Sequence, residues 1–127
     1  MHQNQLFEYA VIRIVPRVER EEFLNVGVIL YCAKQQFLQT ISCLNEDRLA
    51  AFCIETDKDE LLQHLNAIQR ICVGDSEAGP IAKLDMAARF RWLTATRSTV
   101  VQTSKVHPGF CKNPQQTLEK LYARLVC

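Results

Sequence analysis

Basic and aromatic side chains alternate in the last third of the chain, and such residues bind phosphates and nucleic acids. Cationic side chains neutralise phosphate groups, and aromatic rings stack on bases and sugars. This pattern in residues 83–112 predicts a site for a phosphate ligand or a nucleic acid. The alternative is an ordinary charged face, whose charges are solvated or paired with acidic residues of the same chain. The residues concerned are Arg89, Phe90, Arg91, Trp92, Arg97, Lys105, Phe110 and Lys112.

A guanidinium and two hydroxyls follow one another at Arg97-Ser98-Thr99, at the start of a predicted strand. Such a group can hold a phosphate or a carboxylate through bidentate hydrogen bonds. The same residues also suit an ordinary strand start. The sequence contains neither a P-loop nor a dinucleotide-binding glycine motif that would favour the ligand. Both interpretations stay open.

His107 and Cys111 are the residues that could act as a base and a nucleophile. Such a pair works only when the two side chains lie within hydrogen-bond reach. Pro108 and Gly109 between them disfavour the helical turn that would bring them together. We therefore expect no catalysis, and a small enzyme using this pair is the weaker alternative. Three dispersed histidines and scattered cysteines also predict no metal site and no cofactor.

Two polar residues interrupt otherwise apolar strands. Arg13 lies within an apolar run and is expected to meet a carboxylate such as Glu8, Glu19 or Glu22, because an unpaired buried charge is costly. Asn25 is expected to orient a turn or to line a small cleft. Both residues also fit a purely architectural role.

The overall charge of +1 conceals an uneven distribution. Residues 1–80 contain 7 basic and 12 acidic side chains, whereas residues 81–127 contain 8 basic and 2 acidic ones. The balance is therefore −5 in the first part and +6 in the second. A near-neutral sum excludes a uniformly basic nucleic-acid binder but not a local site for an anion.

Length and composition indicate one soluble globular domain over residues 1–127. The longest apolar stretch, residues 26–33, is too short to span a bilayer, and the N-terminus lacks the basic region of a secretory signal. The six cysteines form no Cys-x-x-Cys pair. We expect a reduced cytoplasmic protein that has no contact with membranes.

The elements that position these residues follow from periodicity. Residues 6–15 carry apolar side chains on both faces, which predicts a central strand covered on both sides. Strands are also predicted over residues 23–32, 37–44 and 98–103, and an irregular loop over residues 105–112.

The strand over residues 23–32 contains a glycine, Gly27, which indicates a bulge or a close approach of another backbone. Simple alternation along this strand predicts one apolar face made by Leu24, Val26, Val28, Leu30 and Cys32.

Helical spacing follows the third strand. A short helix begins after Asn45, a longer one runs from Asp57 to Gly74 with His64 packed beside its apolar stripe, and Asn113-Pro114 begins the last helix. Residues 86–94 fit a helix capped by Asp85 or a strand. The order of elements predicts an α+β domain in which helices pack on an antiparallel sheet of about four strands.

Three blocks of this sequence, YAVIRIVPR at 9–17, EEFLNVGVILY at 21–31 and RFRWL to RSTVVQ at 89–102, resemble the bacterial family catalogued as domain of unknown function 3037. The resemblance implies a small protein without an assigned activity, often encoded beside a HipA-like kinase. It transfers no catalytic residue, but it directs attention to a candidate polar or anion-binding set: Arg13, Arg17, Glu22, Asn25, Arg89, Trp92, Arg97, Ser98 and His107.

The leading hypothesis is therefore a non-catalytic accessory or protein-interaction domain, with the HipA-like kinase as the partner that the resemblance implies. The hypothesis from another class is a phosphate-ligand or nucleic-acid binder that uses residues 83–112.

Overall fold

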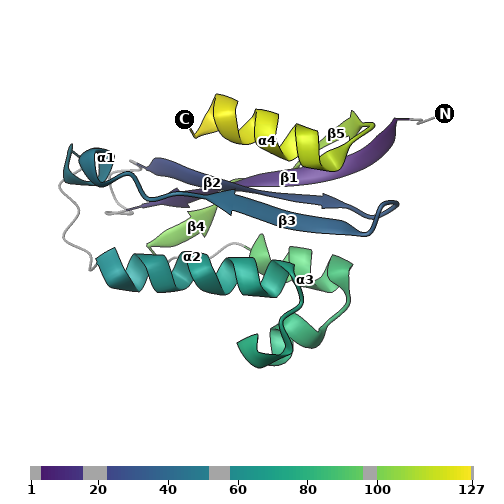
Figure 1. Ribbon diagram of the computed structural model, residues 1–127, viewed down its shortest axis with the longest axis horizontal. Coiled ribbons are helices and arrows are strands. Elements are labelled where there is room, and N and C mark those ends of the chain that lie inside the picture. Colours follow the sequence, from purple (N-terminus) through teal and green to yellow (C-terminus); the bar gives the residue numbers. More distant parts are fainter. Residues whose placement is uncertain (1–3, 16–22, 52–57, 96–99, 127) are drawn as a thin grey trace.

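The computed structural model describes residues 4–15, 23–51, 58–95 and 100–126. An antiparallel sheet of five strands separates two layers of helices, with α4 on one face and α2 and α3 on the other (Figure 1). This confirms the predicted α+β class. The strands are β1 (Gln5–Ile14), β2 (Leu24–Cys32), β3 (Phe37–Ser42), β4 (Val101–Thr103) and β5 (His107–Cys111). The helices are α1 (Glu46–Ala51), α2 (Lys58–Cys72), α3 (Met86–Leu93) and α4 (Pro114–Leu125), with 3-10 turns η2 (Ser76–Ala78) and η3 (Pro80–Lys83).

Strand β1 is the centre of the sheet, as its apolar faces predict. It pairs with β2 along one side, while β4 and β5 share its other side. Ile12 and Ile14 are fully buried in the core beneath α2 and α3, and Phe7 is buried in the core beneath α4. The alternation of β1 thus supplies both hydrophobic cores.

A bulge at Gly27 changes which residues of β2 share a face. Ile12 pairs with Gly27, but Arg13 pairs with Asn25, so Val26 has no opposite residue on β1. An extra residue reverses the alternation of side chains. The single apolar face predicted for this strand is therefore wrong. The residues divide between the two cores: Leu24, Val26 and Ile29 pack under α2 and α3, and Val28, Leu30 and Cys32 pack under α4.

The predicted loop at residues 105–112 is also wrong, because residues 107–111 form β5 and pair with β1. Pro108 and Gly109 resemble turn residues in the sequence. In the fold, a Cβ at position 109 would lie 2.6 Å from Cζ of Phe7. Glycine is thus needed where the Phe7 ring packs against the strand, and proline is tolerated because β5 lies at the sheet edge.

Ser104 lies between β4 and β5, and its hydroxyl accepts a hydrogen bond from a backbone N–H of β1. Its N–H donates to the carbonyl of Val11 at 2.8 Å, and its Oγ accepts from the N–H of Val11 at 2.8 Å. Its hydroxyl donates in turn to the carbonyl of Lys105 at 2.9 Å. The side chain therefore satisfies a buried donor of the central strand at the point where the edge strand is interrupted.

We expect Ser104→Ala to lower the free energy of unfolding by about 1–3 kcal/mol, because the buried Val11 N–H loses its acceptor. Urea denaturation of both proteins measures this difference. Ser76→Ala at an exposed position is the control, and it should change stability by less than about 0.5 kcal/mol. Equal stability of the Ser104→Ala and Ser76→Ala variants would contradict the role of the hydroxyl.

The helix boundaries follow the predicted caps. The side chains of Asn45, Asp85 and Asn113 accept from backbone N–H groups three residues on, and Gly74 ends α2 with a φ of 72°. Residues 86–93 form a helix and not the strand that the sequence also allows. The Asp57 cap lies outside the described residues. No helix in the described ranges is long and apolar enough to cross a membrane.

Candidate functional site

The five described residues of the predicted polar set lie in three places. Arg13 and Asn25 are opposite each other on β1 and β2, Arg89 and Trp92 lie on α3, and His107 lies on β5. The structure therefore brings together only two pairs of these five. The other predicted members, Arg17, Glu22, Arg97 and Ser98, lie outside the described residues.

Arg13 packs against an aromatic ring. Its Cζ lies 4.0 Å from the centroid of the Phe23 ring, a cation–π contact. Burial lowers the pKa of this guanidinium, and its Nε has no hydrogen-bond partner among the described residues. Among the described carboxylates none forms an ion pair with Arg13, so Glu8 is not the predicted partner; Glu19 and Glu22 lie outside the described residues.

Asn25 holds the end of α4 in place. Its Nδ2 donates to the carbonyl of Leu125 at 3.1 Å, and Arg48 Nη1 from α1 donates to the carbonyl of Val126 at 2.6 Å. The last carbonyls of a helix have no hydrogen-bond partner within the helix. A cation near them is also stabilised by the negative end of the helix dipole. These side chains and Tyr122 line a cavity of about 240 Å³. The small cleft predicted beside Asn25 is thus present, at the contact between sheet and helix.

Arg89 is used within the fold. Its Nη1 donates to the carbonyl of Leu84 at 2.9 Å, and its guanidinium lies against Gly74 at the end of α2. Burial raises the pKa of the nearby Cys72 to about 12, an effect that the positive charge of Arg89 partly opposes. Arg89 therefore connects α3 to the turn after α2.

The charges of the basic segment are not neutralised by ion pairs within the described part of the chain. Both ion pairs found there, Lys58 with Glu46 and Arg70 with Asp75, join residues of the acidic first part. The exposed cations of the segment are distributed over η3, α3 and the two ends of β5: Lys83, Arg91, Lys105 and Lys112.

His107 and Cys111 are separated by the extended conformation of β5. Four residues of strand place their Cα atoms about 13 Å apart, beyond hydrogen-bond reach. The His107 ring stacks instead on Tyr9, with centroids 5.3 Å apart. Burial raises the pKa of the Cys111 thiol, which lies near Thr117 and Cys32. The arrangement does not activate the thiol as a nucleophile.

We expect His107→Ala to leave the alkylation rate of Cys111 unchanged, because the imidazole is too far away to accept its proton. Timed iodoacetamide labelling followed by mass spectrometry of the Cys111 peptide measures this rate. The exposed Cys43 is the internal standard and should react faster than Cys111. A slower reaction of Cys111 in the variant would indicate that the pair interacts.

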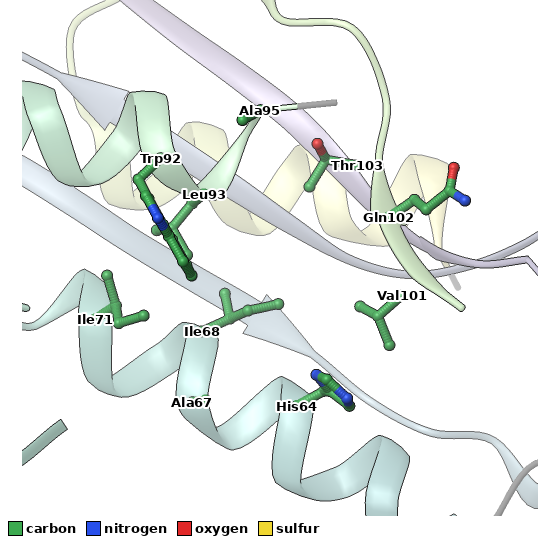
Figure 2. Close-up of a pocket in the computed structure, with 10 residues that line it drawn as sticks. All are labelled: His64, Ala67, Ile68, Ile71, Trp92, Leu93, Ala95, Val101, Gln102 and Thr103. Atoms are coloured by element: carbon green, nitrogen blue, oxygen red, sulfur yellow. The ribbon is translucent and has the colours of Figure 1, made fainter. Parts of the chain in front are cut away.

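A cavity of about 190 Å³ lies between α2, α3 and β4, and it includes one residue of the predicted set, Trp92 (Figure 2). His64 stands at its other end. The sequence predicts a packed His64, and this is wrong: the side chain is exposed because it borders the buried stripe rather than belonging to it. The cavity itself has no sequence signal, since its walls come from three separate elements.

A second feature that the sequence does not reveal is an exposed apolar pair on the sheet. Leu6 on β1 is directly opposite Phe110 on β5, and the two are 51% and 71% exposed. They alternate with Phe7 and Cys111, which are buried beneath α4, so they point to the other face. Tyr31 and Phe110 line a cleft of about 400 Å³ there. We call Leu6, Glu8, Tyr31, Lys34 and Phe110 the Leu6–Phe110 surface.

In the described ranges no three His, Cys, Asp or Glu side chains are grouped so as to hold a metal ion.

Comparison with other proteins completes this description. No curated protein and no solved structure matches the chain. The model of one protein family, described as "Protein of unknown function (DUF3037)", matches residues 9–126, and the chain belongs to that family.

Proposed function

We propose that this chain is a cytosolic protein-interaction domain that binds its partner through the Leu6–Phe110 surface. The observation that carries the proposal is the cross-strand pair itself, with Phe110 71% exposed although it belongs to strand β5. Scattered apolar side chains are common on protein surfaces. Adjacent large ones beside a cleft are typical of sites that another molecule covers.

The Leu6–Phe110 surface has an apolar centre and a polar edge, as protein–protein interfaces do. Burying the exposed parts of Leu6 and Phe110 is worth about 2–4 kcal/mol. Glu8 and Lys34 line the same cleft and can make hydrogen bonds or ion pairs around the apolar centre.

The surface is also held rigidly, which favours binding. The Phe7 ring packs on Gly109 behind β5, and the ring of Tyr31 stacks on Phe90 of α3 with centroids 5.2 Å apart. The strands at this surface therefore lose little conformational entropy when a partner binds.

The partner we propose is the HipA-like kinase that the family resemblance implies. Support for the kinase is the association of genes alone, whereas support for an interface is the exposed pair. Support for the cytosol is the presence of four free cysteines, Cys32, Cys43, Cys72 and Cys111, among the described residues.

Affinity purification of the tagged chain at native expression tests the proposal. We expect the kinase to be retained by the wild type and by Val73→Ser, and to be lost with Phe110→Ser. Val73 is a suitable control because it is apolar and 55% exposed, and it lies in the turn after α2. Recovery of the chain alone would contradict the interaction, and equal retention by Phe110→Ser would contradict the surface.

A second candidate is the binding of a phosphate ligand or a nucleic acid. It is favoured by the exposed cations Lys83, Arg91, Lys105 and Lys112, which form no ion pair within the described ranges. Binding of this kind weakens steeply as salt rises and is reduced by Arg91→Glu. Filter binding with a short oligonucleotide at several salt concentrations tests it, and binding independent of salt would exclude it.

A further inference from the structure

The cavity between α2, α3 and β4 lies apart from the Leu6–Phe110 surface and shares no residue with it. Ile68 and Ile71 of α2, Leu93 of α3 and Val101 of β4 form apolar walls. Figure 2 shows the Trp92 side chain directed from α3 toward Ile68 and Ile71, so that its ring forms one side of the space.

His64, Gln102 and Thr103 also line this space, and Figure 2 shows the Gln102 side chain directed away from it. His64 lies at one end of the cavity on α2, and Thr103 lies on β4. Neither side chain makes a hydrogen bond within the described part of the chain. An imidazole and a hydroxyl can each donate to or accept from a ligand.

Size and charge restrict what the cavity can hold. A cavity of about 150 Å³ lined by apolar side chains binds benzene, so about 190 Å³ accommodates one ring with a small substituent. None of its described lining residues is acidic, lysine or arginine. A charged ligand would lose its hydration there without gaining a partner of opposite charge.

We propose that this cavity binds a small uncharged aromatic molecule that carries a hydrogen-bonding substituent, the chemistry of a phenol. The ring packs between the Trp92 indole and the isoleucines of α2. The substituent bonds to Thr103 or His64. This activity is separate from the proposed protein interaction, because it uses different residues.

The chain contains a single tryptophan, and that residue lines the cavity. Its indole N–H thus gives one resolved signal in a ¹H–¹⁵N spectrum, and that signal reports occupancy directly. We expect phenol to shift it saturably and toluene to shift it with weaker affinity. Benzoate should have the weakest effect, because its carboxylate has no charged partner among the described lining residues.

Two alanine positions give a matched pair of variants. Ala67 lines the cavity on α2, whereas Ala123 is an exposed alanine of α4 on the opposite face of the sheet. Ala67→Leu should weaken phenol binding at least tenfold by filling the space, and Ala123→Leu should leave it unchanged. Thr103→Val removes a hydroxyl at nearly constant shape. It should weaken phenol binding by about two- to tenfold and leave toluene binding unchanged.

Three results would overturn the inference: no saturable shift of the Trp92 signal with phenol, tighter binding of benzoate than of phenol, or wild-type affinity for phenol in Ala67→Leu. A folded spectrum of each variant shows that a loss of binding is not a loss of structure. Failure of the cavity leaves the result of the kinase purification unaffected, so the two proposals are tested separately.

Discussion

Gly27→Ala should lower the free energy of unfolding by about 3 kcal/mol. A Cβ at this position would lie 2.8 Å from the carbonyl oxygen of Ile41, 2.8 Å from Cβ of Ser42 and 3.1 Å from Cδ1 of Ile12. The carbonyl oxygen of Ile41 is a backbone atom of β3, and Cβ of Ser42 is attached directly to that backbone. Ile12 is fully buried. The added methyl group therefore separates β2 from β3 or displaces the core.

The matched control is Gly109→Ala, which gains the same atom in another strand. There the three atoms nearest to the added Cβ all belong to the ring of Phe7, so the change strains a side-chain contact and not the pairing of two backbones. Both changes reduce the freedom of the unfolded chain equally, so the difference between them isolates the native contacts. Urea unfolding of the two variants should show the larger loss for Gly27→Ala. A Gly27→Ala protein as stable as the wild type would contradict the close approach of the strands.

Phe110→Ala should weaken binding of the proposed partner, a HipA-like kinase, by about 30-fold, which corresponds to about 2 kcal/mol. Aromatic side chains at the centre of an interface typically contribute most of the binding energy, and Phe110 is the most exposed large apolar residue of the described chain. Its removal should leave folding stability within about 0.5 kcal/mol of the wild type, because little of the side chain is buried in the free protein.

Leu6→Ala gives the companion measurement. Leu6 faces Phe110 across the strand pair, so the two truncations should not be additive in their effect on binding. Val73→Ala, on an exposed apolar residue elsewhere, should bind as the wild type does. Additive losses from Leu6→Ala and Phe110→Ala would indicate that the two side chains contact the partner independently.

The parts of the fold that the sequence predicts are those decided by local signals. The caps at Asp85 and Asn113 and the terminating Gly74 depend on hydrogen bonds and dihedral angles within a few residues. The central position of β1 is also predictable, because apolar side chains occur on both of its faces.

The parts that the sequence misses depend on contacts between distant segments. Gly27 predicts the bulge correctly, but the sequence misses its effect: pairing with β1 and β3 divides the side chains of β2 between two cores. The Pro108-Gly109 pair has a local preference for a turn, but packing on Phe7 makes it part of β5. Tertiary contacts outweigh local propensity in both places.

The same distinction applies to the candidate sites. Residue types alone favour Arg13 and Arg89 as ligands for anions, yet the fold uses the first against the Phe23 ring and the second on the carbonyl of Leu84. Leu6 and Phe110 are distant in the sequence and become neighbours only through the pairing of β1 with β5. No periodicity within a single segment indicates such a surface.

We propose that the Leu6–Phe110 surface binds a protein partner. Isothermal titration of the proposed partner, the HipA-like kinase, with the wild-type chain, Phe110→Ala and Val73→Ala tests this most directly. We expect measurable binding by the wild type, equal binding by Val73→Ala and a loss of about 30-fold with Phe110→Ala. Equal affinity of Phe110→Ala and the wild type, or no binding by the wild type, would contradict it.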